Sequence, residues 1–307
     1  MCPICESCGL TGNDDGLFCR NRQCKQHATP FSFVNNKPIL IDFDRSLVTA
    51  NSFLNSAGSS VVIRTESGLK KWIRGIFRGK SGITRNNVGE LIQRINLLSE
   101  PKILVVGGGE IGAGLDDFYT VFEKDILDFD IYDSAHVNLI ADAHQIPVKD
   151  SYFDVVIIQA VLEHVLNPQK VVSEITRVLK DNGIVYAETP FIQQVHEGPY
   201  DFTRFTESGH RYLFRNYSLI SSGYTAGAGS SLIWTLDFFF SGLFRTRTAG
   251  KITRILFFWL RFFDKLIPAP FNTDAACGVY FMGTKSSAPM HNKQIITHYK
   301  GNQVSHS

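Results

Sequence analysis

The chain has 307 residues, 44% of them hydrophobic, and a formal net charge of +2. This length allows one large and one small domain, and the small net charge excludes a bulk electrostatic attraction to nucleic acid. The first residues show no signal-peptide pattern, and five of the six cysteines lie within the first 24 residues. We therefore expect a cytoplasmic protein whose cysteines bind a metal rather than form disulfides.

Residues 1–44 are predicted to form a small zinc-ribbon-like module with Zn²⁺ in a tetrahedral sulfur site. The ligands that we favour are Cys5, Cys8, Cys19 and Cys24. Cys2 competes with Cys8 for this role, and His27 competes with Cys24. The stretches 30–34 and 38–41 are expected to be the strands that close the ribbon. Because a core of about forty residues is too small to be stable alone, we expect the metal to be structural; docking of a substrate or partner is the alternative.

Residues 45–100 are predicted to be a linker and N-terminal helices. The composition of 45–60, rich in Ser, Asn and Ala, is typical of a mobile connector. The stretch 69–80 mixes basic and bulky apolar residues on one helical face, so it either packs on the main domain or lies on an anionic membrane. A second amphipathic helix is expected over 87–99.

The stretch 102–114 begins with a continuous apolar run, 103–106, that predicts a strand buried on both faces of a parallel sheet. Glycines follow at once, and Gly107, Gly109 and Gly112 fit the spaced-glycine pattern of nucleotide-binding turns. A helix is expected over 112–122, whose N-terminal amides would face a bound anionic group. A glycine-rich turn without a ligand is the alternative.

Further strands are expected at 126–132, 137–140 and 184–188, with a helix over 168–179, and this alternation predicts a parallel sheet with helices on both faces. Asp130 ends the second strand, 18 residues after Gly112. An acid at this position can accept hydrogen bonds from two ribose hydroxyls, in a dinucleotide-binding enzyme and a methyltransferase alike.

The sequences Ala-Asp-Ala-His-Gln-Ile-Pro at 141–147 and Phe-Asp-Val-Val-Ile-Ile-Gln-Ala-Val-Leu-Glu-His-Val at 153–165 separate these classes. With these motifs the chain resembles the class I S-adenosylmethionine-dependent methyltransferases of type 11, closely over 101–215 and loosely over 218–285. The resemblance implies an α/β fold, with a doubly wound, mostly parallel, seven-stranded Rossmann-like sheet over residues 101–285. It also implies a closing antiparallel strand near 277–283 at the sheet edge.

The resemblance further implies S-adenosylmethionine as cofactor. Its carboxylate would lie on the amides between Gly107 and Gly112, and Asp130 would hold the ribose. Asp142 would accept a hydrogen bond from the adenine amino group, with Ala143 and Ile146 flanking the ring. One residue departs from the family pattern: Val105 stands where an acid is common.

The stretch 189–206 follows a strand end and is rich in aromatic and charged residues, as expected of an acceptor-pocket wall. His196 is the candidate general base, because its unperturbed pKa lies near neutrality. His164 is expected to orient the cofactor or the pocket. A network of Tyr200, Asp201 and Arg204 that only braces the loop is the alternative.

Residues 230–271 form an aromatic insertion with interspersed basic residues. Because no run reaches the roughly twenty apolar residues of a membrane span, we expect an interfacial hairpin with peripheral membrane contact, or a lid over an apolar substrate. Helices that bury these rings against the sheet edge are the alternative. The polar stretch 286–307 is expected to be disordered.

Together these features predict methyl transfer to a small or lipid- or glycan-linked acceptor, with O-methylation as the default. RNA base methylation is a second hypothesis, since some RNA methyltransferases carry a cysteine-rich module, but the net charge disfavours it. A nicotinamide-dependent oxidoreductase would rest on the glycine spacing alone. A non-catalytic scaffold that recruits partners is the fourth hypothesis.

Overall fold

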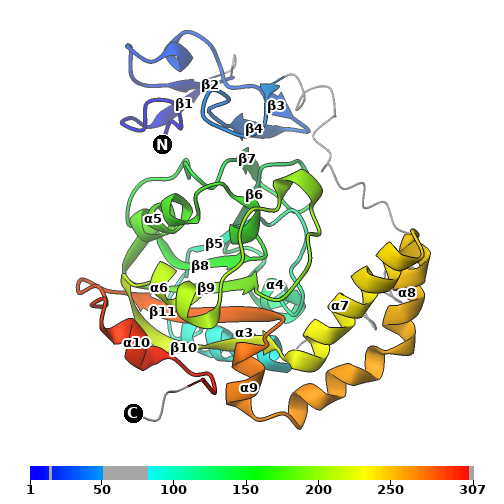
Figure 1. The fold of residues 1–307 in the computed structure, drawn as a ribbon. Coiled ribbons are helices and arrows are strands. Elements are labelled where there is room, and N and C mark those ends of the chain that lie inside the picture. Colours follow the sequence, from blue (N-terminus) through cyan, green and yellow to red (C-terminus); the bar gives the residue numbers. More distant parts are fainter. Residues whose placement is uncertain (14–15, 51–81, 304–307) are drawn as a thin grey trace.

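The computed structural model describes residues 1–13, 16–50 and 82–303. Its main feature is a nine-stranded sheet in the order β10-β11-β9-β8-β5-β6-β7-β4-β3 (Figure 1). These strands are β3 (Phe33–Val34), β4 (Lys37–Leu40), β5 (Ile103–Val106), β6 (Ile126–Asp130), β7 (Leu139–Ala141), β8 (Phe153–Gln159), β9 (Leu179–Pro190), β10 (Tyr217–Ala226) and β11 (Gly278–Lys285). The pairs from β9 to β4 are all parallel, as the strand–helix alternation predicts.

Strand β5 lies at the centre of the sheet and is buried at every position. Leu104 and Val106 belong to the hydrophobic cluster on one face, where α5 (Pro168–Val178) and α6 (Glu207–Leu213) pack. Ile103 and Val105 belong to the cluster on the other face, with α3 (Gly82–Ile95) and α4 (Asp116–Phe122). This alternation explains why the sequence of β5 is apolar throughout: each side chain meets a helix layer.

The N-terminal module extends the predicted seven-stranded sheet by two strands. Strand β4 pairs in parallel with β7, with Ile39 opposite Ile140, and β3 pairs with β4. The strands expected at 30–34 and 38–41 are present as the antiparallel pair β3–β4, and Phe31 is bridged to Leu17 in the other hairpin of the module, β1 (Leu10–Asn13) with β2 (Gly16–Cys19). What the sequence did not predict is that β4 continues the pairing into the main sheet. Because Ile39 and Ile41 pack with Ile140, the module is joined to the main core.

Strand β11 is antiparallel, as expected, but it does not lie at the edge of the sheet. It pairs with β9 on one side and β10 on the other. Its residues Val279, Phe281 and Met282 are fully buried, whereas Ser218 and Leu219 of β10 are exposed. The burial pattern thus gives the edge position to β10.

The insertion consists of α7 (Ala228–Leu243), α8 (Arg247–Leu256), η4 (Phe258–Lys265) and α9 (Ala269–Asp274). We call these elements the aromatic arm; α7 and α8 extend away from the sheet (Figure 1), whereas α9 contacts β10. The Asp264 carboxylate accepts hydrogen bonds from the first amides of α7, 3.0 Å from Gly227 N and 2.7 Å from Gly229 N. Buried Asp237 pairs with Arg254 and joins α7 to α8.

Many rings of the aromatic arm remain in solvent, with Phe239 59% and Phe244 62% exposed. This exposure contradicts the alternative in which the rings are buried against the sheet edge. Among the described helices, none has both the length and the apolar character needed to cross a bilayer.

The C-terminal stretch is ordered up to residue 303, contrary to expectation. Helix α10 (Gln294–His298) is held against the main domain, with His298 Nε2 2.8 Å from Glu207 Oε1. Lys300 Nζ donates to the Ser222 carbonyl oxygen at 2.8 Å. The predicted helix at 69–80 lies outside the described residues. So does most of the predicted connector, but its first part is packed, and Val48 is buried.

Candidate active site

A cavity of about 930 Å³ opens at the carboxyl ends of the parallel strands. This is the edge at which open α/β sheets bind their ligands. The predicted site residues that line the cavity are Gly107, Gly109, Gly112, Asp130, Asp142, Ala143, His164 and His196. The fold therefore brings together the proposed cofactor residues and both histidines.

The glycine-rich turn allows close packing rather than a row of free amides. Gly107 has φ 77°, and a Cβ atom there would lie 2.2 Å from Val161 Cγ2. The amides of Gly107 and Gly108 donate to the Phe129 carbonyl oxygen at 2.9 and 3.0 Å. The helix expected from residue 112 begins only at Asp116. The cofactor carboxylate therefore cannot use these two amides or a helix start at this position.

Asp130, the acid predicted for the ribose, contacts the glycine turn directly. Its Oδ2 accepts a hydrogen bond from Gly109 N at 3.0 Å, and its Oδ1 accepts one from Ile131 N at 2.6 Å. A Cβ atom on Gly109 would lie 2.6 Å from Asp130 Oδ2. A glycine at 109 is thus required for the carboxylate to lie against the main chain.

At the adenine end of the predicted site, Asp142 is bound on both oxygens. Oδ1 accepts hydrogen bonds from His144 N at 2.9 Å and from Nδ1 of the same residue at 2.6 Å, and Oδ2 accepts one from Ser46 Oγ at 2.6 Å. Burial alone would raise the pKa of Asp142, but these hydrogen bonds outweigh it and hold the pKa below its usual value. Leu47 and Val48 line the cavity beside it. No sequence signal pointed to these N-terminal residues.

Ile146 does not flank the cavity, and the expectation for it is wrong. Its side chain is 1% exposed and belongs to the core cluster under α5. The main chain holds it there, because Ile146 N donates to Glu174 Oε2 at 3.1 Å. Ala143, by contrast, lines the cavity as expected.

A buried carboxylate that the sequence analysis missed, Glu188, lines the cavity near the glycine turn. It accepts hydrogen bonds from Thr84 Oγ1 at 2.8 Å and from Gln159 Nε2 at 2.7 Å. Gln159 in turn abuts Gly112, where a Cβ atom would lie 1.7 Å from Gln159 Oε1. Burial raises the pKa of Glu188. Val105 faces the core, whereas Glu188 places a buried acidic group in the cavity wall.

At the other end lie Glu163, His164 and His196, which we call the cavity cluster. Glu163 Oε1 lies 3.6 Å from His164 Nε2 and 3.8 Å from His196 Nε2. The Glu163 side chain is 1% exposed, and neither carboxylate oxygen has a hydrogen-bond partner among the described residues. Burial raises the pKa of Glu163 to about 8 and lowers that of His164.

The loop that carries His196 is held by a network that includes Tyr200, Asp201 and Arg204, as one of the two alternatives for this loop predicted. His164 Nδ1 lies 2.7 Å from the Tyr200 carbonyl oxygen, and His196 N donates to Asp201 Oδ2 at 2.9 Å. Arg204 forms an ion pair with Asp201. Burial would raise the pKa of Asp201, but the hydrogen bonds from Arg204 and His196 lower it to about 2. The network thus positions both histidines.

The aromatic arm contributes Trp234 to the cavity wall. The Trp234 and His196 rings lie 6.3 Å apart, and Arg254 lies 4.8 Å from the Trp234 ring centre on the other helix of the arm. The base of the arm and the cavity cluster are therefore neighbours.

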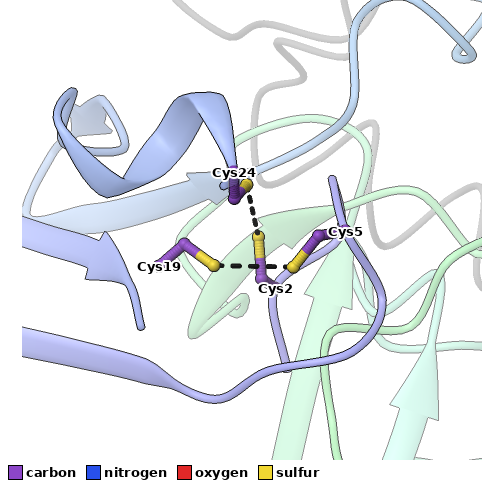
Figure 2. A group of neighbouring side chains, drawn as sticks. All are labelled: Cys2, Cys5, Cys19 and Cys24. Carbon is purple, nitrogen blue, oxygen red and sulfur yellow. Dashed lines mark hydrogen bonds between the residues drawn. The ribbon is translucent and has the colours of Figure 1, made fainter. Parts of the chain in front are cut away.

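In the N-terminal module, Cys2, Cys5, Cys19 and Cys24 converge, and their sulfurs lie within 4.8 Å of one another (Figure 2). We call this group the cysteine cluster. The Sγ atoms of Cys2 and Cys24 are 3.9 Å apart, and those of Cys5 and Cys19 are 3.5 Å apart. A tetrahedral Zn²⁺ site with bonds of about 2.3 Å requires sulfurs about 3.8 Å apart, so the donor set fits this ion.

The cluster contains Cys2 in place of the favoured Cys8. Glu6 N donates to the Cys2 carbonyl oxygen at 3.0 Å and closes a turn that brings Cys2 and Cys5 together. Cys8 lies beyond this turn. His27 is also outside the group, because its Nδ1 lies 2.9 Å from the Cys19 carbonyl oxygen.

Residues 116–187 match a family model described as a methyltransferase domain. A search of curated proteins found no matching sequence. Similar solved structures include an S-adenosylmethionine-dependent methyltransferase from Archaeoglobus fulgidus, 13% identical with a TM-score of 0.44, covering 70% of this chain and 99% of that one. Phosphoethanolamine N-methyltransferase 2 from Haemonchus contortus, in complex with phosphomonomethylethanolamine and S-adenosylhomocysteine, is 15% identical with a TM-score of 0.44 and covers 70% and 57%.

Proposed function

We propose that this chain, whose residues 116–187 match a methyltransferase domain, is an S-adenosylmethionine-dependent methyltransferase that methylates an acceptor bound beside His164 and His196. The observation that supports this most is a single cavity that holds the glycine turn with Asp130 and Asp142 at one end and both histidines at the other. When bound, S-adenosylmethionine supplies its methyl group as an electrophilic sulfonium. The main task of the protein is then to hold the acceptor in line with the methyl carbon.

Three carboxylates divide the recognition of the cofactor. Asp130, held against the glycine turn, is the group for the ribose hydroxyls. Asp142 and Ala143 are the groups for adenine. Glu188 is proposed for the cofactor ammonium, because a carboxylate near Gly112 supplies the charge that Val105 does not. The buried Glu188 is hydrogen-bonded on both sides and so is fixed before the ligand arrives.

The acceptor is proposed to be a small or lipid- or glycan-linked molecule, methylated on oxygen. His164 and His196 are the proposed catalytic residues, since imidazole groups can activate a hydroxyl near neutral pH. Trp234 gives this end of the cavity an apolar wall, which suits an acceptor with an apolar part.

Peripheral membrane contact through the aromatic arm follows from its exposed side chains. Exposed aromatic residues stand among exposed basic ones, which suits an anionic lipid surface. They are Phe239, Phe244, Phe258, Trp259, Phe262 and Phe263, with Arg245, Arg247, Lys251 and Lys265. Vesicles containing phosphatidylserine should sediment the protein, whereas Phe239→Ser with Phe244→Ser should weaken this and Ile296→Ser, exposed elsewhere, should not. Equal binding to neutral vesicles, or none, would contradict the proposal.

We also propose that the cysteine cluster binds a structural Zn²⁺. Four thiolates form the closed kind of site that stabilises a fold and leaves no position for a substrate. Cys8, although close in sequence, is not a ligand in this proposal.

Calorimetric titration with S-adenosylhomocysteine tests the cofactor assignment. We expect binding that Asp130→Asn weakens about tenfold or more, the loss of one charge-assisted hydrogen bond. Asp125→Asn, which changes an exposed acid five positions before Asp130, should have no effect on this binding. Binding of NAD but not of S-adenosylhomocysteine would favour the oxidoreductase, and binding of neither would favour the scaffold. Labelled S-adenosylmethionine with lipid and glycan extracts, and RNA as a further arm, would then identify the acceptor class.

A further inference from the structure

We propose that Glu163, His164 and His196 bind a divalent transition-metal ion at the acceptor end of the cavity. One ligand atom from each residue lies within 4.8 Å of the other two, and all three residues line the cavity. The site itself stands on this geometry; only its use in catalysis rests on the proposed methyl transfer.

The hydrogen bonds of the two rings aim lone pairs at the carboxylate. His164 Nδ1 lies 2.7 Å from the Tyr200 carbonyl oxygen, which can only accept, so Nδ1 carries the proton. Nε2 of the neutral ring therefore presents a lone pair to Glu163. His196 is arranged alike, with Nδ1 3.3 Å from the Gln194 carbonyl oxygen and 3.5 Å from Asp201 Oδ2. When an incoming metal ion displaces the proton of Glu163, the three ligand atoms converge on it as electron-pair donors.

The Glu163 carboxylate is poorly compensated in the described part of the chain, where the charge of Arg204 acts on it without a direct contact. Glu163 is buried, and no hydrogen bond reaches either of its oxygens there. The guanidinium of Arg204 is engaged by Asp201 and by the Gln193 carbonyl oxygen. Leaving a polar group in this state is costly, and a bound cation removes the cost.

The donor set indicates the class of ion. Two imidazole nitrogens and one carboxylate oxygen suit divalent first-row metals such as Mn²⁺, Fe²⁺, Co²⁺ or Zn²⁺. Bonds of about 2.0–2.2 Å in a tetrahedral site need ligand atoms about 3.4 Å apart, slightly closer than the 3.6 and 3.8 Å found. Carbonyl partners on the outer nitrogens are what metal-binding histidines ordinarily have.

Three protein ligands leave positions open toward the cavity, where an acceptor hydroxyl can bind. The ion lowers the pKa of the hydroxyl, whose proton passes to water. The acceptor oxygen then forms a bond to the methyl carbon while the carbon–sulfur bond of the sulfonium breaks, giving a methyl ether and the neutral thioether. In this arrangement His196 holds the ion, and this role replaces the general-base role proposed for it under the methyl transfer described above.

The test measures metal binding directly on the full chain. After loading with Co²⁺ or Zn²⁺ and removal of excess metal, we expect about two ions per chain, one at the cysteine cluster and one at the cavity cluster. Glu163→Gln and His196→Ala should each retain about one ion. Mn²⁺, which disfavours thiolates, should bind the cavity cluster alone in an electron paramagnetic resonance titration, about tenfold or more weakly in Glu163→Gln.

Glu197→Gln is the matched control, because this carboxylate lines the same cavity but lies outside the cluster; its metal content should equal that of the wild type. Circular dichroism melting confirms that each variant is folded. One ion per chain that only Cys19→Ser removes, together with no Mn²⁺ binding, would overturn the inference and favour a protonated Glu163 that donates to one of the histidines. S-adenosylhomocysteine titrated in the same samples separates the two proposals: its binding without Mn²⁺ binding refutes the metal site and leaves methyl transfer standing.

Discussion

The cysteine cluster and the cavity cluster both gather metal-binding side chains, but in opposite settings. The cysteine cluster has four like ligands at the spacing of a filled tetrahedron, within a module whose core is small. The cavity cluster has three unlike ligands, and two of them, His164 and His196, are about one-fifth to one-quarter exposed to the cavity. The first arrangement completes a fold and the second leaves room for a ligand, so ligand number and access, more than ligand type, separate structure from chemistry.

The largest expected effect comes from breaking the cysteine cluster. Structural Zn²⁺ contributes about 10–16 kcal/mol in zinc-finger peptides, so Cys19→Ser should unfold the module. Because β4 pairs with β7 and Val48 lines the cavity, S-adenosylhomocysteine binding should be lost too. Metal analysis and calorimetry measure both. Cys8→Ser is the control; if it were as damaging as Cys19→Ser, the ligand set favoured from the spacing would be right after all.

The next largest effect is expected from adding a side chain to the glycine turn of the cavity, away from both clusters. Gly107→Ala combines a positive φ with a clash against Val161, at a cost of about 3–4 kcal/mol. We expect S-adenosylhomocysteine affinity to fall about 100-fold with the metal content unchanged. Gly242→Ala, where a Cβ atom would meet nothing within 4 Å, should leave the affinity unaltered. Loss of metal in Gly107→Ala would show that the two clusters and the cavity are not independent.

His210 is a buried titratable group outside the cavity, and its burial makes the stability of the protein depend on pH. Its ring is fully buried beside Phe205 and Phe214, neither nitrogen has a hydrogen-bond partner among the described residues, and burial lowers its pKa to about 3. The unfolded value is about 6.5, so below that pH the unfolded state binds more protons. The contribution to stability is therefore complete above pH 6.5 and is lost as the pH falls toward 3, by about 3 kcal/mol at pH 4.5.

His210→Phe should remove this part of the pH dependence. Urea unfolding of both proteins at pH 7 and pH 4.5 measures how far the free energy of unfolding falls between the two pH values. The difference between wild type and variant in this fall isolates His210, because the other titrating groups contribute equally to both proteins. Parallel curves for the two proteins would mean that His210 is protonated in the folded state.

The smallest expected effect is a change in the free energy of unfolding that has opposite signs for the two clusters. Without metal and at pH 9, above the Glu163 pKa of about 8, Glu163→Gln removes a buried carboxylate that no hydrogen bond reaches in the described structure, so the free energy of unfolding should rise by about 1–2 kcal/mol. Breaking the cysteine cluster lowers stability, whereas this change raises it. Urea unfolding in a chelator measures it, and a loss of stability would indicate that Glu163 already has a favourable partner.

What the sequence predicts well is what depends on neighbouring residues in the chain. The apolar run at 103–106 predicts a buried strand, and the strand is present. Asp130 ends the second predicted strand as expected, while its role toward the ribose stays a prediction. The cysteine spacing predicts a sulfur site, although the turn that selects Cys2 over Cys8 depends on one main-chain hydrogen bond.

What the sequence does not predict depends on distant segments meeting at one edge of the sheet. Ser46 reaches Asp142 across 96 positions, and no local pattern encodes that contact. Both histidines of the cavity cluster could be singled out by their chemistry. Glu163 could not, because a charged residue beside a strand end ordinarily points to water, and only the folded loop 189–206 encloses it.

The pairing of β4 with β7 bears on how the protein can be shortened. A fragment that starts at residue 82 would retain the central strands but would leave the outer side of Leu139–Ala141 without its neighbour. Unpaired peptide groups along a bare apolar strand recruit strands from other molecules. Such a fragment would therefore be expected to self-associate in solution, because residues 37–40 of the N-terminal module cover this strand in the full chain.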